Sequence, residues 1–185
     1  MEAIETFEAA GFTVSLYHEE DPESPREWDN LGKMVCWHRR SNLGDRTVRS
    51  QDFKDMEELV ASFEARVILP LYLYEHSGMT MRTYPFGDPW DSGQVGWIYA
   101  TTEAIRKEYG VEHISDETED KVKAVLRGEV ETYDQYLTGD VYGYVVKDEA
   151  GEHVDSCWGF FGLEYACQEA KAALASASNG KQATE

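Results

Sequence analysis

Two aspartates three residues apart stand in an unusual glycine- and proline-rich stretch, residues 77–97. Asp88 and Asp91 flank Trp90, and Glu75 and His76 come directly before the stretch. Carboxylate and imidazole groups this close in sequence can bind a divalent cation or form the polar part of a small-molecule pocket. The glycines match no phosphate-binding pattern, because GxxxxGK[ST] and GxGxxG are both absent.

A second interpretation of residues 77–97 needs no ligand. Phe86 and Trp90 would fill a groove in the body of the protein, and the aspartates would form turns and caps. The sequence favours this packed loop, and neither a metal nor a cofactor is expected. The residues of the alternative pocket, a site for a small enzyme or a ligand- or metal-binding protein, are Glu75, His76, Asp88, Trp90 and Asp91.

Cysteine and histidine form the next candidate set. Cys36 and His38 alternate on one expected strand, and His153 and Cys157 share a face of another. If those strands are neighbours, the four groups, with His76, can form a zinc site or a Cys/His nucleophile pair. Because no ligand spacing is diagnostic and cysteine is commonly buried, ordinary core packing is favoured. The GxSxG motif of serine hydrolases is missing.

The strongest chemical signal is negative charge. The chain has 36 acidic and 17 basic residues, which gives a formal net charge of −19 at pH 7. Such an excess repels nucleic acid and anionic membranes and attracts basic protein surfaces. Carboxylates that recur along one side of a helix present charge on a scale similar to DNA phosphates, although a solvated helix face is the commoner explanation. The candidate partner-binding carboxylates are Glu19, Glu20, Asp21, Glu23, Asp116, Glu117, Glu119, Asp120, Glu129, Glu131 and Asp134.

One stretch is locally basic. Arg39, Arg40, Arg46, Arg49 and Lys54 outnumber the two aspartates in residues 39–54. These cations either neutralise the acidic N-terminus or bind an anionic ligand. A chain of this net charge repels nucleic acid at long range, so direct nucleic-acid binding is not expected.

Strands and helices in mixed order must position these groups. Strands are expected in residues 12–20, 33–40, 68–76, 79–86 and 93–101, and residues 139–162 form the clearest hairpin. Helices are expected in residues 50–67 with Ser50 or Asp52 as cap, 101–110, 115–137 with Gly128 as a candidate break, and 163–177. This order predicts an α+β fold, a mainly antiparallel sheet with hairpins that is packed by three to four helices.

Length and composition set the remaining limits. The 185 residues, 42% of them hydrophobic, suit a single domain over residues 1–178 with a flexible C-terminal tail over 179–185. Three cysteines are too few for a disulfide framework. The acidic N-terminus lacks the order of a signal peptide, and no apolar run reaches membrane-spanning length. These features predict a cytoplasmic protein with no membrane partner.

Four strings are more distinctive than any of these patterns: LPLYLYEHSGMTM, PWDSGQVGWIY, GEVETYDQYLTGDVYGYVV and DSCWGFFG. They resemble an uncharacterised family of proteins carried by bacteriophages and other mobile elements, and the resemblance covers residues 25–170. The resemblance implies a role in the biology of mobile DNA, whose accessory proteins often counter host defences. It assigns no catalytic residue to this chain. The acidity is also similar in kind to that of DNA-mimicking anti-restriction and anti-CRISPR proteins, by charge alone.

Together these observations predict a non-enzymatic accessory protein of a phage or mobile element in the cytoplasm of a bacterial host cell. Its expected partner is a host nucleic-acid-binding protein or complex with a basic groove, such as a restriction or CRISPR effector, which the acidic surfaces would block. A homodimer that pairs exposed strands is a further expectation.

Overall fold

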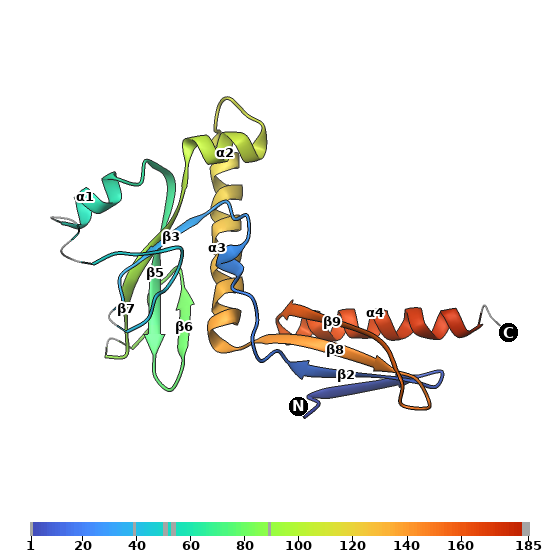
Figure 1. Ribbon diagram of the computed structural model, residues 1–185. Helices are drawn as coiled ribbons and strands as arrows, with labels where there is room; N and C mark the ends of the chain where they lie inside the picture. Colours follow the sequence, from blue (N-terminus) through green and yellow to red (C-terminus); the bar gives the residue numbers. More distant parts are fainter. Residues whose placement is uncertain (1, 39, 50–51, 53–54, 89, 183–185) are drawn as a thin grey trace. The chain divides into compact units, whose positions relative to one another are not determined.

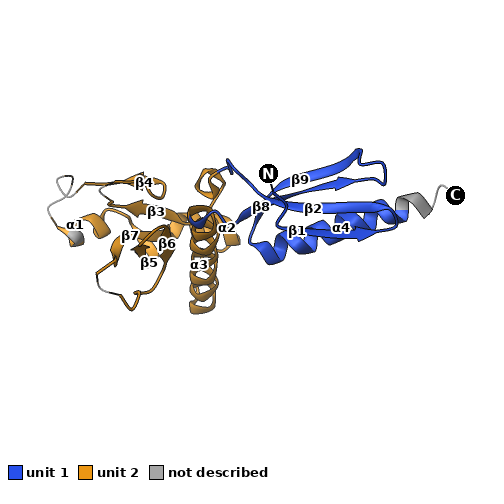
Figure 2. Ribbon diagram, turned by 90° about the horizontal axis from the view of Figure 1, so that it is seen from below, with its two compact units in different colours: residues 1–23, 138–185 blue, residues 24–137 orange. Residues whose placement is uncertain are grey.

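The computed structural model describes residues 2–38, 40–49, 52, 55–88 and 90–182. Its contacts divide the chain into two compact units, shown in Figure 2. Unit 1 consists of Met1–Glu23 and Thr138–Glu185, and unit 2 consists of Ser24–Leu137. The sequence groups residues 1–178 into one domain, whereas unit 1 is discontinuous and unit 2 is inserted within it.

Unit 1 is a four-stranded antiparallel sheet with one helix. The strands lie in the order β1-β2-β8-β9; β1 and β2 form one hairpin, β8 and β9 form another, and β2 pairs with β8. Their bounds are β1 Glu5–Ala9, β2 Phe12–His18, β8 Val141–Lys147 and β9 His153–Phe161, and the helix is α4 Leu163–Gln182. The hairpin expected in residues 139–162 is confirmed as β8 and β9, whereas β1 was not predicted.

Helix α4 lies along one face of this sheet (Figure 1). Val14, Leu16 and Val146 are fully buried on that face, and Ala166 and Ala170 of α4 pack against them. The small alanine side chains let the helix approach the strands closely. The helix continues to Gln182, so residues 179–182 of the expected tail are helical, and residues 183–185 lie outside the described part of the chain.

Unit 2 is a five-stranded sheet in the order β4-β3-β7-β5-β6, parallel only between β3 and β4. Its strands are β3 Lys33–Cys36, β4 Arg46–Thr47, β5 Ala65–Glu75, β6 Met79–Arg82 and β7 Ser92–Thr101. Its helices are η1 Pro25–Glu27, α1 Met56–Ala61, α2 Thr102–Tyr109 and α3 Asp116–Thr138. With helices packed on two mostly antiparallel sheets, the predicted α+β class is confirmed.

Helix α3 forms the main core of unit 2. Its apolar residues repeat at helical spacing, so that Val122, Leu126 and Val130 pack against Met34 and Ile98 of the sheet. The helix is continuous through Gly128, so the candidate break there is wrong. Figure 1 shows α3 running beside the strands of this unit.

Helix α1 is shorter than its sequence predicted. It begins after Asp55, whose carboxylate accepts a hydrogen bond from the Glu58 N–H at 2.9 Å. Asp52 is therefore not the cap, and Ser50, the other candidate, lies outside the described residues. Phe63 anchors the following turn by stacking on Tyr99 at a centroid distance of 4.5 Å. Packing of this aromatic pair, rather than helix length, fixes the segment on the sheet.

Candidate functional site

Glu129, predicted to face a partner, instead holds unit 2 together. Its side chain is 11% exposed and its carboxylate lies 3.0 Å from the guanidinium of Arg26. The same carboxylate accepts hydrogen bonds from the N–H groups of Leu31 and Gly32, both at 3.0 Å. It therefore anchors the segment before β3 to α3 and is unavailable to another protein.

Arg26 is the centre of this network. Its guanidinium also binds Asp45 at 2.9 Å, and Asp45 in turn accepts a hydrogen bond from the Met34 N–H at 2.8 Å. Burial by itself lowers the pKa of Arg26, but the hydrogen bonds and charges of Asp45 and Glu129 outweigh burial and raise it. Arg26 is therefore charged at neutral pH, and each of its two carboxylate partners also accepts a hydrogen bond from a backbone N–H group.

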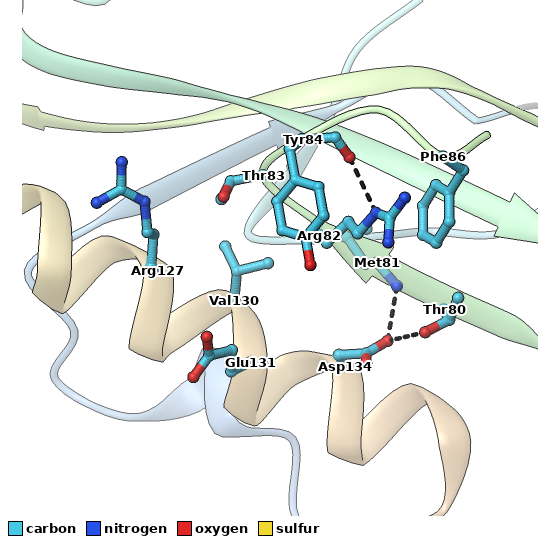
Figure 3. A pocket seen from close by; sticks show the side chains of 10 residues that line it. All are labelled: Thr80, Met81, Arg82, Thr83, Tyr84, Phe86, Arg127, Val130, Glu131 and Asp134. Carbon is cyan, nitrogen blue, oxygen red and sulfur yellow. Dashed lines mark hydrogen bonds between the residues drawn. The ribbon is translucent and has the colours of Figure 1, made fainter.

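Two further carboxylates of α3 face their own unit. Asp134 accepts hydrogen bonds from the Thr80 hydroxyl at 2.7 Å and the Met81 N–H at 2.6 Å, which ties α3 to β6 (Figure 3). Glu119 forms an ion pair with Arg66. These carboxylates are structural, so the predicted acidic face of α3 is narrower than the sequence suggests.

The remaining candidate carboxylates of α3 are exposed. Glu117 pairs with Lys121 at 2.7 Å, and Asp120 pairs with Lys123 at 2.9 Å. The hydrogen bond from Lys121 lowers the pKa of Glu117. Asp116 and Glu131 complete the exposed set. Because neighbouring lysines offset two of the four charges, α3 presents a weak rather than a dense acidic stripe.

Unit 1 has the higher acidic excess. Residues 1–23 and 138–185 contain 15 acidic and three basic residues, whereas residues 24–137 contain 21 acidic and 14 basic residues. Several carboxylates of unit 1 are exposed and have no ion-pair or hydrogen-bond partner among the described residues: Glu8, Glu20, Asp21, Glu152 and Glu164. Lys171, one of the three cations, lies over the Phe7 ring at 4.5 Å. Negative charge is thus concentrated in unit 1.

The predicted cluster at residues 19–23 belongs to this acidic unit. Glu19 accepts a hydrogen bond from the Gly159 N–H of β9 at 2.7 Å. Glu20, Asp21 and Glu23 are exposed. One carboxylate of the cluster therefore joins β2 to β9, and the other three project from the surface.

The loop at residues 77–97 combines one confirmed and one wrong expectation. Phe86 packs as predicted, with its ring 5.6 Å from Tyr74 and 3.7 Å from the guanidinium carbon of Arg82. Trp90 is 92% exposed, so the expectation that it fills a groove is wrong. The Asp88 carboxylate accepts a hydrogen bond from the Trp90 N–H at 2.8 Å and closes a turn that points this ring outward.

Two cavities adjoin this loop. One, of about 270 Å³, lies between the end of β6 and α3 (Figure 3). The other, of about 500 Å³, includes Glu75 in its lining together with Arg40, Ser41 and Ser77. The remaining residues of the predicted pocket, which line neither cavity, are His76, Asp88, Trp90 and Asp91. The structure thus places hollows beside the loop but separates them from most of the predicted polar groups.

The histidines beside the loop do not form a complete catalytic set. His38 accepts a hydrogen bond from the Ser41 N–H at Nδ1, and its Nε2 faces Glu75 at 3.5 Å, so neither nitrogen is free to act as a base. His76 pairs through Nδ1 with Asp91 at 3.0 Å and is exposed. No hydroxyl or thiol hydrogen bond to His76 is found among the described residues. Neither histidine therefore has an assembled nucleophile.

The predicted cysteine and histidine site is not assembled by strand pairing. Cys36 lies on β3, whereas His153 and Cys157 lie on β9 of the other sheet. Burial, followed by the charge of Asp45, raises the pKa of the Cys36 thiol to about 12. Across the described part of the chain, no group of three or more His, Cys, Asp or Glu residues is arranged to hold a metal ion. Cys36 is a core residue, as the sequence favoured.

The basic stretch also finds partners within unit 2. Arg40 lies 3.6 Å from Glu75. The backbone N–H of Arg49, rather than its guanidinium, donates to the Asp52 carboxylate at 2.8 Å, and Arg46 is exposed on β4. Arg39 and Lys54 lie outside the described residues.

Comparisons with known proteins identify no relative. The chain matches no protein-family model, and neither a curated protein nor a solved structure matches it. Within the described ranges, no helix has both the length and the apolar character needed to cross a bilayer.

Proposed function

We propose that this protein is an accessory protein of a phage or mobile element that binds and inhibits a host nucleic-acid-handling defence protein. Its acidic surface occupies the partner's basic groove, where nucleic acid would otherwise bind. The observation that carries this proposal is the acidic excess of unit 1, which has 15 acidic and three basic residues and several exposed carboxylates without cationic partners. The resemblance of four sequence strings to mobile-element proteins supports the context.

The electrostatic argument favours unit 1 over α3. A carboxylate already bound to an internal cation contributes little to the field outside the protein, whereas an unpaired exposed carboxylate contributes fully and steers a basic partner toward it. Glu20 and Asp21 are of the second kind, and Glu119 and Glu129 are of the first. The exposed acids of α3, Asp116, Glu117, Asp120 and Glu131, form the secondary contact surface in this proposal.

The test compares two charge-matched variants. One neutralises the unit 1 residues Glu8, Glu20, Asp21, Glu152 and Glu164 to glutamine or asparagine. The other neutralises the exposed unit 2 residues Asp29, Glu57, Glu103, Glu108 and Glu112, which lie outside both proposed contact surfaces, in the same way. Both change the net charge equally, so a difference between them reports where the partner binds.

Each tagged protein is used to capture host proteins at low and high salt, and the captured protein is then purified and offered labelled duplex DNA. We expect the parent and the unit 2 variant to displace DNA from it, and the unit 1 variant to fail. High salt should release the complex, because exposed charges are screened. Equal behaviour of the two variants, or capture that displaces no DNA, would exclude the proposed mechanism.

The cavity of about 270 Å³ supports a second candidate function, the binding of a small polar ligand under the loop. Arg127 and Glu131 line it from α3, and Thr83 and Tyr84 line it from the loop (Figure 3). A cation and an anion on one wall suit a zwitterionic molecule. Native mass spectrometry of the purified protein tests this second function. We expect a bound small molecule in the parent protein and its loss in the Arg127→Ala variant.

A further inference from the structure

The face of the unit 1 sheet opposite α4 carries an aromatic pair, the half-buried Tyr17 and the exposed Trp158. Because successive side chains of a strand alternate between faces, the burial of Leu16 and Tyr144 beneath α4 places Tyr17 and Gly143 on the other face. Tyr17 is directly opposite Gly143 in the register of β2 and β8. The ring of Trp158 from β9 lies over Gly143 and stacks with Tyr17 at a centroid distance of 6.4 Å and an interplanar angle of 30°.

Gly143 provides the space in which Trp158 sits. A Cβ atom at this position would overlap the six-membered ring of Trp158, so only glycine lets the indole lie against the strand. The pairing of β8 with β9 is irregular between Tyr142 and Tyr144, and Gly159 follows with a φ of +84°. The backbone is thus shaped to hold the indole flat beside Tyr17 rather than to bury it, since Trp158 remains 37% exposed.

Carboxylates lie at one end of this aromatic pair. Glu19 follows Tyr17 by two residues, on the same face, and its carboxylate reaches the Gly159 N–H beside the indole. The exposed Glu20 and Asp21 come next in the chain. Flat aromatic rings bordered by negative charge are complementary to a planar cation, and the guanidinium of arginine stacks on such rings while it forms hydrogen bonds to carboxylates.

We infer that Tyr17 and Trp158 receive an arginine side chain of the basic partner, with Glu19 close enough to pair with it. This inference rests on the proposed function and adds the position and chemistry of its central contact. Arginine rather than an apolar side chain is the occupant, because unit 1 carries 15 acidic and three basic residues. Tryptophan, tyrosine and arginine are also the residue types in which the binding energy of protein interfaces is concentrated.

The probe is a fluorescently labelled peptide of alternating arginine and glycine, and the readout is its affinity for the whole protein. Trp158→Ala should weaken binding by about 2- to 30-fold, the range expected for loss of a cation–aromatic contact. Trp158→Phe should restore most of the affinity, because it retains an aromatic face. Trp90→Ala is the matched control, since Trp90 is the more exposed tryptophan and lies in unit 2, and it should leave the affinity unchanged.

A second readout reports on the site directly. The chain has five tryptophans, and their indole N–H groups give separate cross-peaks in a nitrogen–proton correlation spectrum. Trp158→Phe identifies the Trp158 peak by its loss. Titration with the arginine peptide should shift this peak and leave the Trp90 peak in place. A peptide in which citrulline replaces arginine should shift neither, because citrulline is uncharged.

The outcomes separate the inference from the proposed function. In one outcome the parent binds the peptide and the unit 1 charge variant does not, but Trp158→Ala and Trp90→Ala bind it with equal affinity and the Trp158 peak does not shift. That outcome would refute the aromatic contact and leave the proposed function standing. If the peptide binds the parent and both charge variants equally, the proposed function fails. Light scattering tests for self-association of the protein. If the protein self-associates and Trp158→Ala abolishes this, a second copy of the chain and not an arginine occupies the aromatic pair, and the inference is wrong. Melting temperatures of all variants verify that each is folded.

Discussion

The two units differ in how much of their negative charge is offset by cations of the same unit. Unit 2 places carboxylates such as Glu129 and Asp134 where they bind backbone N–H groups and cations of the same unit. Unit 1 leaves carboxylates such as Glu20 and Glu164 exposed, without a partner among the described residues. The contrast teaches that an acidic residue found in a helix or loop cannot be assigned to a surface by its type. Its neighbours in space determine whether it holds the fold together or faces outward.

The largest expected effect is the loss of stability when Glu129 is replaced. Glu129→Ala leaves the guanidinium of Arg26 with one carboxylate fewer and the N–H groups of Leu31 and Gly32 without an acceptor. The free energy of unfolding should fall by about 3–5 kcal/mol. Urea denaturation followed by circular dichroism measures it.

Glu131→Ala is the matched control, because Glu131 lies two residues along α3 and is exposed. It should change the free energy of unfolding by less than about 0.5 kcal/mol. Similar losses in the two variants would show that Glu129 is not the anchor of its unit.

The next effect on stability is expected in unit 1, where the close packing of Gly143 against the Trp158 ring is tested. Gly143→Ala places a methyl group inside the Trp158 ring and should lower the free energy of unfolding by about 1–3 kcal/mol. In a Trp158→Ala background the methyl group has room, so the same substitution should cost far less. Additive losses in the double variant would contradict a direct contact between these residues.

A further effect, confined to alkaline pH, is expected from the thiol of Cys36. Its pKa is about 12 in the folded protein and close to 9 when the chain is unfolded. In the folded protein the thiol stays protonated to a higher pH than in the unfolded chain. Its contribution to the free energy of unfolding is therefore fully present below pH 9 and is lost as the pH rises toward 12. The change is about 1.4 kcal/mol per pH unit in that window.

The measurement for Cys36 is the free energy of unfolding between pH 8 and pH 10.5, compared with Cys36→Ala. The parent should lose more stability across this range than the variant. Alkylation at pH 8 compares the reactivity of a cysteine from each unit. Cys157 of unit 1 is exposed and should react in the folded protein, whereas the buried Cys36 of unit 2 should react only after unfolding. Rapid modification of Cys36 in the folded protein would refute its burial.

The smallest effect is a gain in stability at Gly128 of α3. This glycine lies within a continuous helix, and a Cβ added there would meet no atom within 4 Å. Gly128→Ala should therefore raise the free energy of unfolding by about 0.5–1 kcal/mol, in contrast to Gly143→Ala. Thermal unfolding followed at 222 nm checks the sign, and a loss of stability would mean that this position packs against something.

Local patterns predicted most elements of the fold. Helix α3 was predicted at residues 115–137 and spans Asp116–Thr138, and α2 ends at Gly110, which has the expected left-handed conformation. The same patterns overestimated α1, because the periodicity of residues 50–67 cannot show that the chain enters β5 at Ala65. They also missed β1, because seven of the eight residues in EAIETFEA are exposed and the segment shows no alternation of buried and exposed residues.

The candidate site was less predictable. Trp90 was expected to be buried because large aromatic residues usually are, yet the turn closed by Asp88 directs it outward. The role of Gly143 was equally hidden, since the ring that requires it comes from the next strand. Both depend on contacts made by the folded backbone, and neither leaves a periodic signal.

The sequence by itself determined the α+β class, the positions of α2, α3 and α4, the β8–β9 hairpin and a net charge of −19, because these follow from composition and from short-range periodicity. Only the tertiary structure decided which carboxylates are internal and which are exposed. Glu129 and Arg26 are 103 residues apart in the chain and 3.0 Å apart in space. Coulomb and hydrogen-bond energies depend on distance in space, so the function of each charge is fixed only when the chain folds.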